Sequence, residues 1–144
     1  GITFNNIRVS FIAFMFGILI SFGTVWILMS NGIMLGAFQY FFHNHDLLFD
    51  SILVIWIHGT LEISSIIIAG AAGIVLGNSI LFPGTFSRIQ SFRIGSKEGL
   101  KIIVSLIPIF IAAGFLESFV TRHTGMPIFL SLFIILGSLS FVLW

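Results

Sequence analysis

The chain has 144 residues, of which 58% are hydrophobic and 8% are charged, and its formal net charge is +1. A soluble domain carries roughly 25% charged residues, so this composition excludes a water-soluble globular domain and indicates an integral membrane protein. Six Lys and Arg residues are too few for a nucleic-acid-binding surface, and the absence of Cys excludes disulfides and thiolate chemistry.

Four apolar segments approach the length of about 20 helical residues that a bilayer core requires. In chain order they cover residues 9–28, with an extension to about 42, then 52–76, 100–120 and 127–144. We therefore expect an all-α bundle of at least four membrane helices in a single transmembrane domain over residues 1–144. The chain starts without Met and ends within an apolar run, so we expect it to be part of a longer protein.

The connection between the second and third segments combines a helix breaker with basic residues. Phe82-Pro83-Gly84 ends the preceding helix, and residues 85–92 suit a short amphipathic helix in the membrane interface. If four helices alternate across the membrane, Arg122 falls on the opposite side from this connection. The other basic residues all fall on the same side as the connection: Arg8, Arg88, Arg93, Lys97 and Lys101. The positive-inside rule then predicts a multi-pass protein of the cell membrane with this loop and the N-terminus in the cytoplasm, and with the loop containing His123 outside.

Three polar residues lie inside apolar segments. His58 and Glu62 are four residues apart and share one helix face, and Glu62 falls near the middle of the membrane. Glu117 falls in the outer half of the next segment, so all three side chains are expected to meet in one pocket. Three interpretations remain open: a structural hydrogen bond between helices, a proton or cation path, or a metal site with all three residues as ligands.

Small residues recur along the second segment, at Ala69, Gly70, Gly73 and Gly77. Such spacing allows helices to approach closely. We expect this face to pack on the chain's own helices, with docking of a partner or a dimer as the alternative. The basic loop with Arg88, Arg93, Lys97 and Lys101 is expected to set topology and contact anionic lipid rather than dock a partner.

A series of short motifs resembles the stage II sporulation protein M family of integral membrane proteins. The motifs span residues 5–121 and follow one another in this order: Asn5-Asn6-Ile7-Arg8-Val9, Asn31-Gly32-Ile33-Met34-Leu35-Gly36-Ala37-Phe38, His58-Gly59-Thr60-Leu61-Glu62, Ala69-Gly70-Ala71-Ala72-Gly73, Phe82-Pro83-Gly84 and Ala113-Gly114-Phe115-Leu116-Glu117-Ser118-Phe119-Val120-Thr121. His58, Glu62 and Glu117 match the family pattern, but the resemblance implies no catalytic residue.

The resemblance implies a membrane scaffold or assembly subunit. In spore formers, a family member works with a peptidoglycan-degrading enzyme and another membrane protein. We therefore expect partners among membrane and envelope proteins, with the lipid bilayer as solvent, a homo-oligomer as a further option, and neither nucleic acid nor a cofactor. The alternatives are an ion- or proton-coupled transporter or channel subunit that uses Glu62 and Glu117, and an intramembrane metal-dependent hydrolase.

Overall fold

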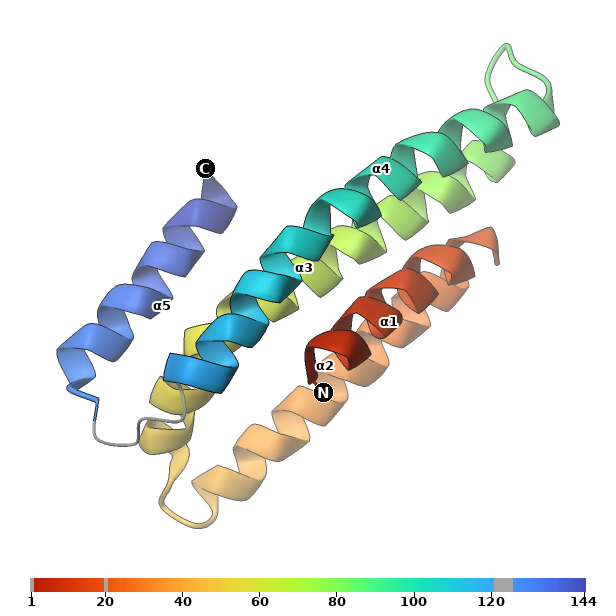
Figure 1. The fold of residues 1–144 in the computed structure, drawn as a ribbon. Helices are drawn as coiled ribbons and strands as arrows, with labels where there is room; N and C mark the ends of the chain where they lie inside the picture. Colours follow the sequence, from red (N-terminus) through yellow and green to blue (C-terminus); the bar gives the residue numbers. More distant parts are fainter. Residues whose placement is uncertain (1, 20, 121–125) are drawn as a thin grey trace.

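The computed structural model describes residues 2–19, 21–120 and 126–144, and these form helices without strands (Figure 1). The elements are α1 (Ile2–Met15), the 3-10 turn η1 (Phe16–Ile18), α2 (Phe22–His43), α3 (Leu48–Leu81), α4 (Arg88–Phe115), the π-helical turn η2 (Leu116–Val120) and α5 (Ile128–Leu143). The expected all-α bundle is confirmed. Within the described residues, three helices are long and apolar enough to cross a membrane, namely α2, α3 and the continuous run Arg88–Val120, while α1 with η1 and α5 are shorter.

The first apolar segment is two helices, so the predicted single helix over residues 9–28 is wrong. The chain turns back after η1, and Ser21 at the start of α2 adopts a left-handed backbone conformation with φ of 64°. The two helices then run antiparallel side by side (Figure 1). Thr24 near the start of α2 donates a 2.7 Å hydrogen bond to the carbonyl oxygen of Ala13 near the end of α1. Hydropathy missed this break because both helices are apolar and the turn contains no proline.

This reversal changes where Arg8 lies. Thr3 at the start of α1 packs against Gly114, near the end of α4 that is far from the α3–α4 connection. Arg8 therefore does not lie with the basic residues next to that connection. The prediction that the start of the chain and these residues lie on the same side of the membrane does not fit the fold. Arg122 and His123, which the sequence places in the opposite loop, fall outside the described residues.

The expected interfacial helix over residues 85–92 does not form as a separate element. The Ser87 side chain accepts a 3.3 Å hydrogen bond from the Gln90 backbone and caps α4, which continues without interruption from Arg88. The Ser91 hydroxyl donates a 2.7 Å bond to the Ser79 carbonyl oxygen of α3. These contacts hold the first turns of α4 along α3, so the two helices form a hairpin that extends past the α1–α2 turn (Figure 1).

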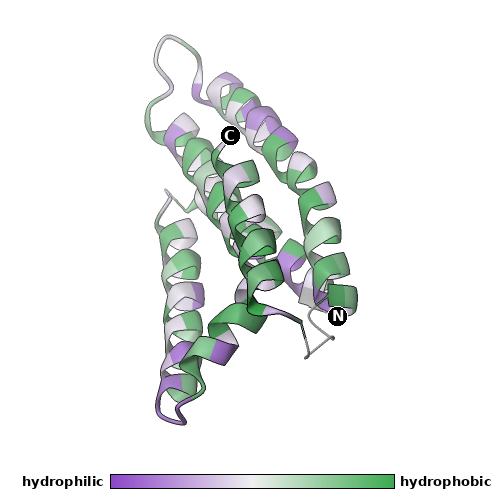
Figure 2. Ribbon diagram, turned by 90° about the vertical axis from the view of Figure 1, so that its left-hand side faces the viewer, coloured by the Kyte–Doolittle hydropathy of each residue, from purple (hydrophilic) through white to green (hydrophobic). Residues whose placement is uncertain are grey.

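Helix α3 is the centre of the bundle, since it contacts α1, α2, α4 and α5. The buried hydrophobic core joins three of these helices through Phe14, Ala69, Ala72, Leu76, Ile103, Leu106 and Phe110. Hydrophilic residues gather around the α2–α3 connection and along the first turns of α4, at the two ends of α3 (Figure 2). The polar residues that interrupt the apolar middle of α3 therefore stand apart from the solvated ends.

Candidate functional site

Glu62 lies near the middle of α3 and its residue surface is only 6% exposed. The side chain of Asn6, on α1, lies close enough to the Glu62 carboxyl group to interact with it. Its Oε1 atom has no hydrogen-bond partner among the described residues. At a rise of about 1.5 Å per residue, Glu62 is about 20 Å from the start of α3. A carboxyl group at this depth is costly unless it is protonated or paired.

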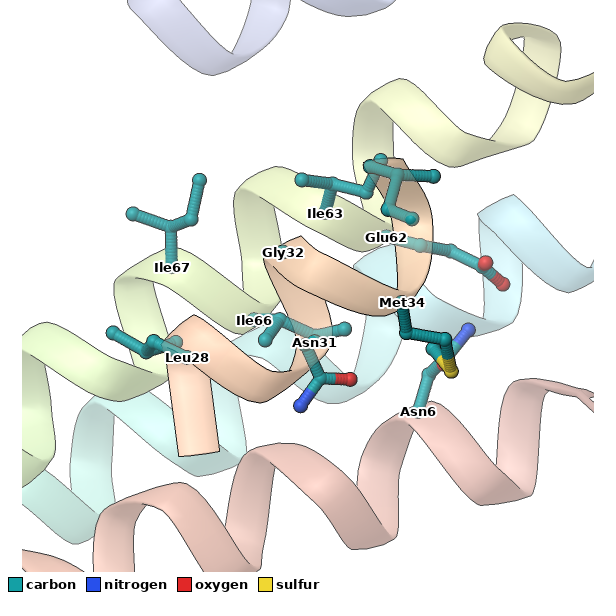
Figure 3. A pocket seen from close by; sticks show the side chains of 10 residues that line it. Asn6, Leu28, Asn31, Gly32, Met34, Glu62, Ile63, Ile66 and Ile67 are labelled. Atoms are coloured by element: carbon teal, nitrogen blue, oxygen red, sulfur yellow. The ribbon is translucent and has the colours of Figure 1, made fainter. Parts of the chain in front are cut away.

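A cavity of about 250 Å³ adjoins Glu62 between α1, α2 and α3. Its polar lining comes from one residue of each helix, Asn6, Asn31 and Glu62, and its walls are aliphatic. Figure 3 shows the Glu62 carboxyl group directed toward Asn6, while Leu28 and Ile67 line the part away from it. The cavity therefore combines an apolar interior with a few oxygen and nitrogen atoms, as ligand and partner pockets do.

His58 and Glu117 lie near this site, on α3 and on the π-helical turn η2. Glu117 is close enough to interact electrostatically with both His58 and Glu62. The π-helical turn widens the end of α4 where Glu117 occurs, and such turns are frequent at functional sites. An imidazole and two carboxyl groups in series also suit proton transfer, which is the alternative that the sequence leaves open.

The metal interpretation finds no support in this geometry. Across the part of the chain that the structure describes, no set of three or more His, Cys, Asp or Glu side chains is arranged to hold a metal ion. Glu117 thus interacts electrostatically with His58 and Glu62, but the three described side chains do not form a ligand cluster.

The small-residue face of α3 packs on the chain's own first two helices and the turn between them. A Cβ atom on Gly73 would lie 2.6 Å from Thr24 Oγ1 and 2.7 Å from the Ala13 carbonyl oxygen. A Cβ on Gly77 would lie 2.7 Å from the Gly17 carbonyl oxygen, and one on Gly70 would press into the Leu28 side chain. Ala69, in the same stretch, is fully buried. This face is therefore occupied within the chain and offers no surface to a partner.

A second pair of small residues, on α2, is free. Gly32 and Gly36 have no atom within 4 Å of the position that a Cβ would occupy. They are four residues apart and share one face, which is the small-xxx-small arrangement of closely packed membrane helices. The sequence shows this spacing, but hydropathy alone does not distinguish it from the covered glycines of α3. Asn6 and Asn31 were likewise missed as cavity residues, because the sequence does not reveal which helices meet.

The basic residues at the other end of the hairpin are exposed: Arg88, Arg93, Lys97 and Lys101. Lys101 pairs with Glu98 at 2.8 Å, and both side chains are more than half exposed. Exposed pairs of this kind contribute little to stability. These side chains are thus available to solvent, lipid headgroups or a partner.

The stage II sporulation protein M family model matches residues 1–122, which is most of the chain. The chain belongs to the stage II sporulation protein M family. The match covers α1 to η2, including the cavity and Glu117, and α5 lies beyond it. Searches of the curated proteins and of the solved structures give no significant match. Family membership and the three long apolar helices make this stage II sporulation protein M relative a multi-pass membrane protein.

Proposed function

We propose that the protein is a membrane scaffold subunit of the cell envelope that binds partner proteins within the bilayer through α2. The observation that carries this proposal is the uncovered state of that helix. None of the most apolar 18-residue window of α2 is buried, compared with 44% for α3 and 33% for the run Arg88–Val120. The protein therefore exposes a helix of membrane-spanning length that contributes little to the buried core of the protein.

The chemistry of the α2 surface supports a protein partner. Lipid tails are as apolar as Leu, so hydrophobicity alone does not drive membrane helices together, and close backbone packing between small residues does. Gly32 and Gly36 offer such packing, and no atom of the described residues lies within 4 Å of the position that a Cβ on either would occupy. A helix that docks there gains contacts that lipid does not provide.

We propose further that the basic α3–α4 connection faces the cytoplasm. Arg88 and Arg93, at the start of α4, lie at the end of α3 opposite to Asp46 in the α2–α3 connection and Asp50 in the first turn of α3. Cytoplasmic loops carry an excess of Lys and Arg. Because Arg8 does not lie with these residues, the proposed orientation depends on the basic residues next to this connection. In this orientation, the membrane helices of the protein would hold a partner enzyme that acts on the envelope.

The test is the recovery of partners from the native membrane. The tagged full-length protein is extracted gently and its complexes are weighed by native mass spectrometry, with Gly36→Leu and the control Gly137→Leu. Gly137 on α5, like Gly36, has no described atom within 4 Å of its Cβ position, so the two substitutions start from equally open surroundings. We expect a stoichiometric membrane partner that is lost with Gly36→Leu and kept with Gly137→Leu. Equal recovery with both variants, or no partner, would overturn the proposal.

A further inference from the structure

We infer that the cavity beside Glu62 receives a Lys or Arg side chain from a partner's transmembrane helix that packs on Gly32 and Gly36 of α2. This inference rests on the proposed scaffold function and names the chemistry of the partner. It follows from three features of the site: an acceptor without a partner among the described residues, a lining that favours a cation, and a glycine of the docking face that also lines the cavity.

The first feature is a carboxyl oxygen of Glu62 that has no hydrogen-bond partner among the described residues. The residue is more than nine-tenths buried, the Asn6 side chain lies close to its carboxyl group, and Oε1 has no hydrogen-bond partner among the described residues. Ionisable groups inside membranes are expensive, and they pair with one another or line functional paths. A buried acid with one oxygen unused among the described residues is therefore a site that a donor from a partner would complete.

The second feature is the chemistry of the cavity lining, which indicates the charge of that donor. The Asn31 amide nitrogen donates a 2.9 Å hydrogen bond to the Ile27 carbonyl oxygen, which leaves the Asn31 side-chain oxygen to accept. Within residues 2–19, 21–120 and 126–144, no basic residue lines the cavity; Arg8, although close in sequence to Asn6, is exposed elsewhere on α1. The described lining thus combines a carboxyl group with the Asn31 side-chain oxygen, which suits an ammonium or guanidinium group better than an anionic group.

The third feature is access from the docking face. Gly32 belongs to the cavity lining and also faces open space on α2, with Gly36 one turn further along the same face. A helix that packs on these glycines therefore lies next to Gly32, a residue of the cavity wall. The aliphatic walls, among them Leu28 and Ile66, would contact the methylene stem of a long basic side chain while its charged end reaches Glu62.

The experiment uses designed peptides as the probe. The full chain is placed in phosphatidylcholine vesicles and labelled through Asn44→Cys, which gives a single thiol because the sequence has no Cys. Energy transfer then reports the binding of a Leu/Ala transmembrane peptide with one central Lys, and of the same peptide with Leu in its place. We expect the Lys peptide to bind about tenfold more tightly, which corresponds to about 1.4 kcal/mol.

Variants of the chain locate the contact. Glu62→Gln is expected to abolish the preference for Lys, and Gly32→Leu to weaken binding of both peptides. Glu62→Asp retains an acid and should keep part of the preference, which separates loss of charge from loss of fold. Glu98→Gln is the control, because that carboxyl group is exposed and lies outside the cavity.

Two results would overturn the inference: equal binding of the two peptides to the unmodified protein, or a Lys preference that survives Glu62→Gln. Either result leaves the scaffold proposal standing if Gly36→Leu still releases the native partner. The reverse outcome also separates the two proposals. If the Lys preference depends on Glu62 but no native partner is recovered, the scaffold proposal is overturned and the binding site beside Glu62 is supported.

Discussion

At the scale of single residues, glycines with the same spacing have different tasks. Gly73 and Gly77 on α3 permit backbone contact with α1 and η1, whereas Gly32 and Gly36 on α2 meet nothing within 4 Å. Adding atoms to a packed site forces shifts that typically cost about 1–3 kcal/mol. The cost of a substitution therefore distinguishes a glycine that closes the fold from one that is available to a partner.

Gly73→Ala should lower the free energy of unfolding by about 1–3 kcal/mol, because its Cβ would press on Thr24 and on the Ala13 backbone. Gly36→Ala is the matched control and should not lower stability, since its Cβ enters open space and Ala has the higher helix propensity. Reversible unfolding in mixed micelles measures both. Equal stability of the two variants would contradict the packing of α3 on the first two helices.

At the scale of elements, the decisive feature is the turn between α1 and α2. It sends α1 back along the bundle, where it brings Asn6 to Glu62 and Thr3 to Gly114. A straight helix through residues 9–28 would carry Thr3 away from both. The cavity wall formed by α1 therefore depends on this one reversal, which the left-handed conformation of Ser21 marks.

Cysteine cross-linking tests the reversal directly, because the sequence contains no other Cys. The pair Thr3→Cys and Gly114→Cys should form a disulfide on mild oxidation, since a Cβ on Gly114 would meet the Thr3 side chain. The pair Thr3→Cys and Gly137→Cys is the control and should remain reduced. Mobility on a denaturing gel reads the result, and absence of the first cross-link would count against the hairpin.

At the scale of the whole molecule, the length of α3 sets how the protein sits in a bilayer. Its 34 residues span about 50 Å, while the hydrocarbon core is about 30 Å thick. The connections at its two ends therefore lie on opposite sides of the membrane. Of these, the one that precedes α4 is followed by the exposed basic residues Arg88 and Arg93.

The proposed orientation predicts which ends react with a membrane-impermeant maleimide. Asn44→Cys, in the α2–α3 connection, should be labelled in intact cells or spheroplasts, and Thr85→Cys only in inverted vesicles. Both residues are exposed, so access to the reagent depends on the side of the membrane. The opposite pattern would show that positive charge does not set the orientation of this chain.

Composition and apolar run length were enough to establish an all-α membrane bundle, because the scarcity of charge leaves no other class. The central parts of α3 and α4 follow from the same runs, and His58 and Glu62 share a face because helical periodicity requires it. The family was likewise evident from motifs that the family model then matched over residues 1–122.

Only the tertiary structure decided where α1 turns back, that residues 88–99 continue α4, and which glycines are covered. It also brought Asn6, Asn31 and Glu62 to one cavity from three helices. Hydropathy reports how favourably each segment leaves water, and it is nearly the same for every face of an apolar helix. The choice of facing helices depends on side-chain shape and on a few polar contacts, which act only once the helices are assembled.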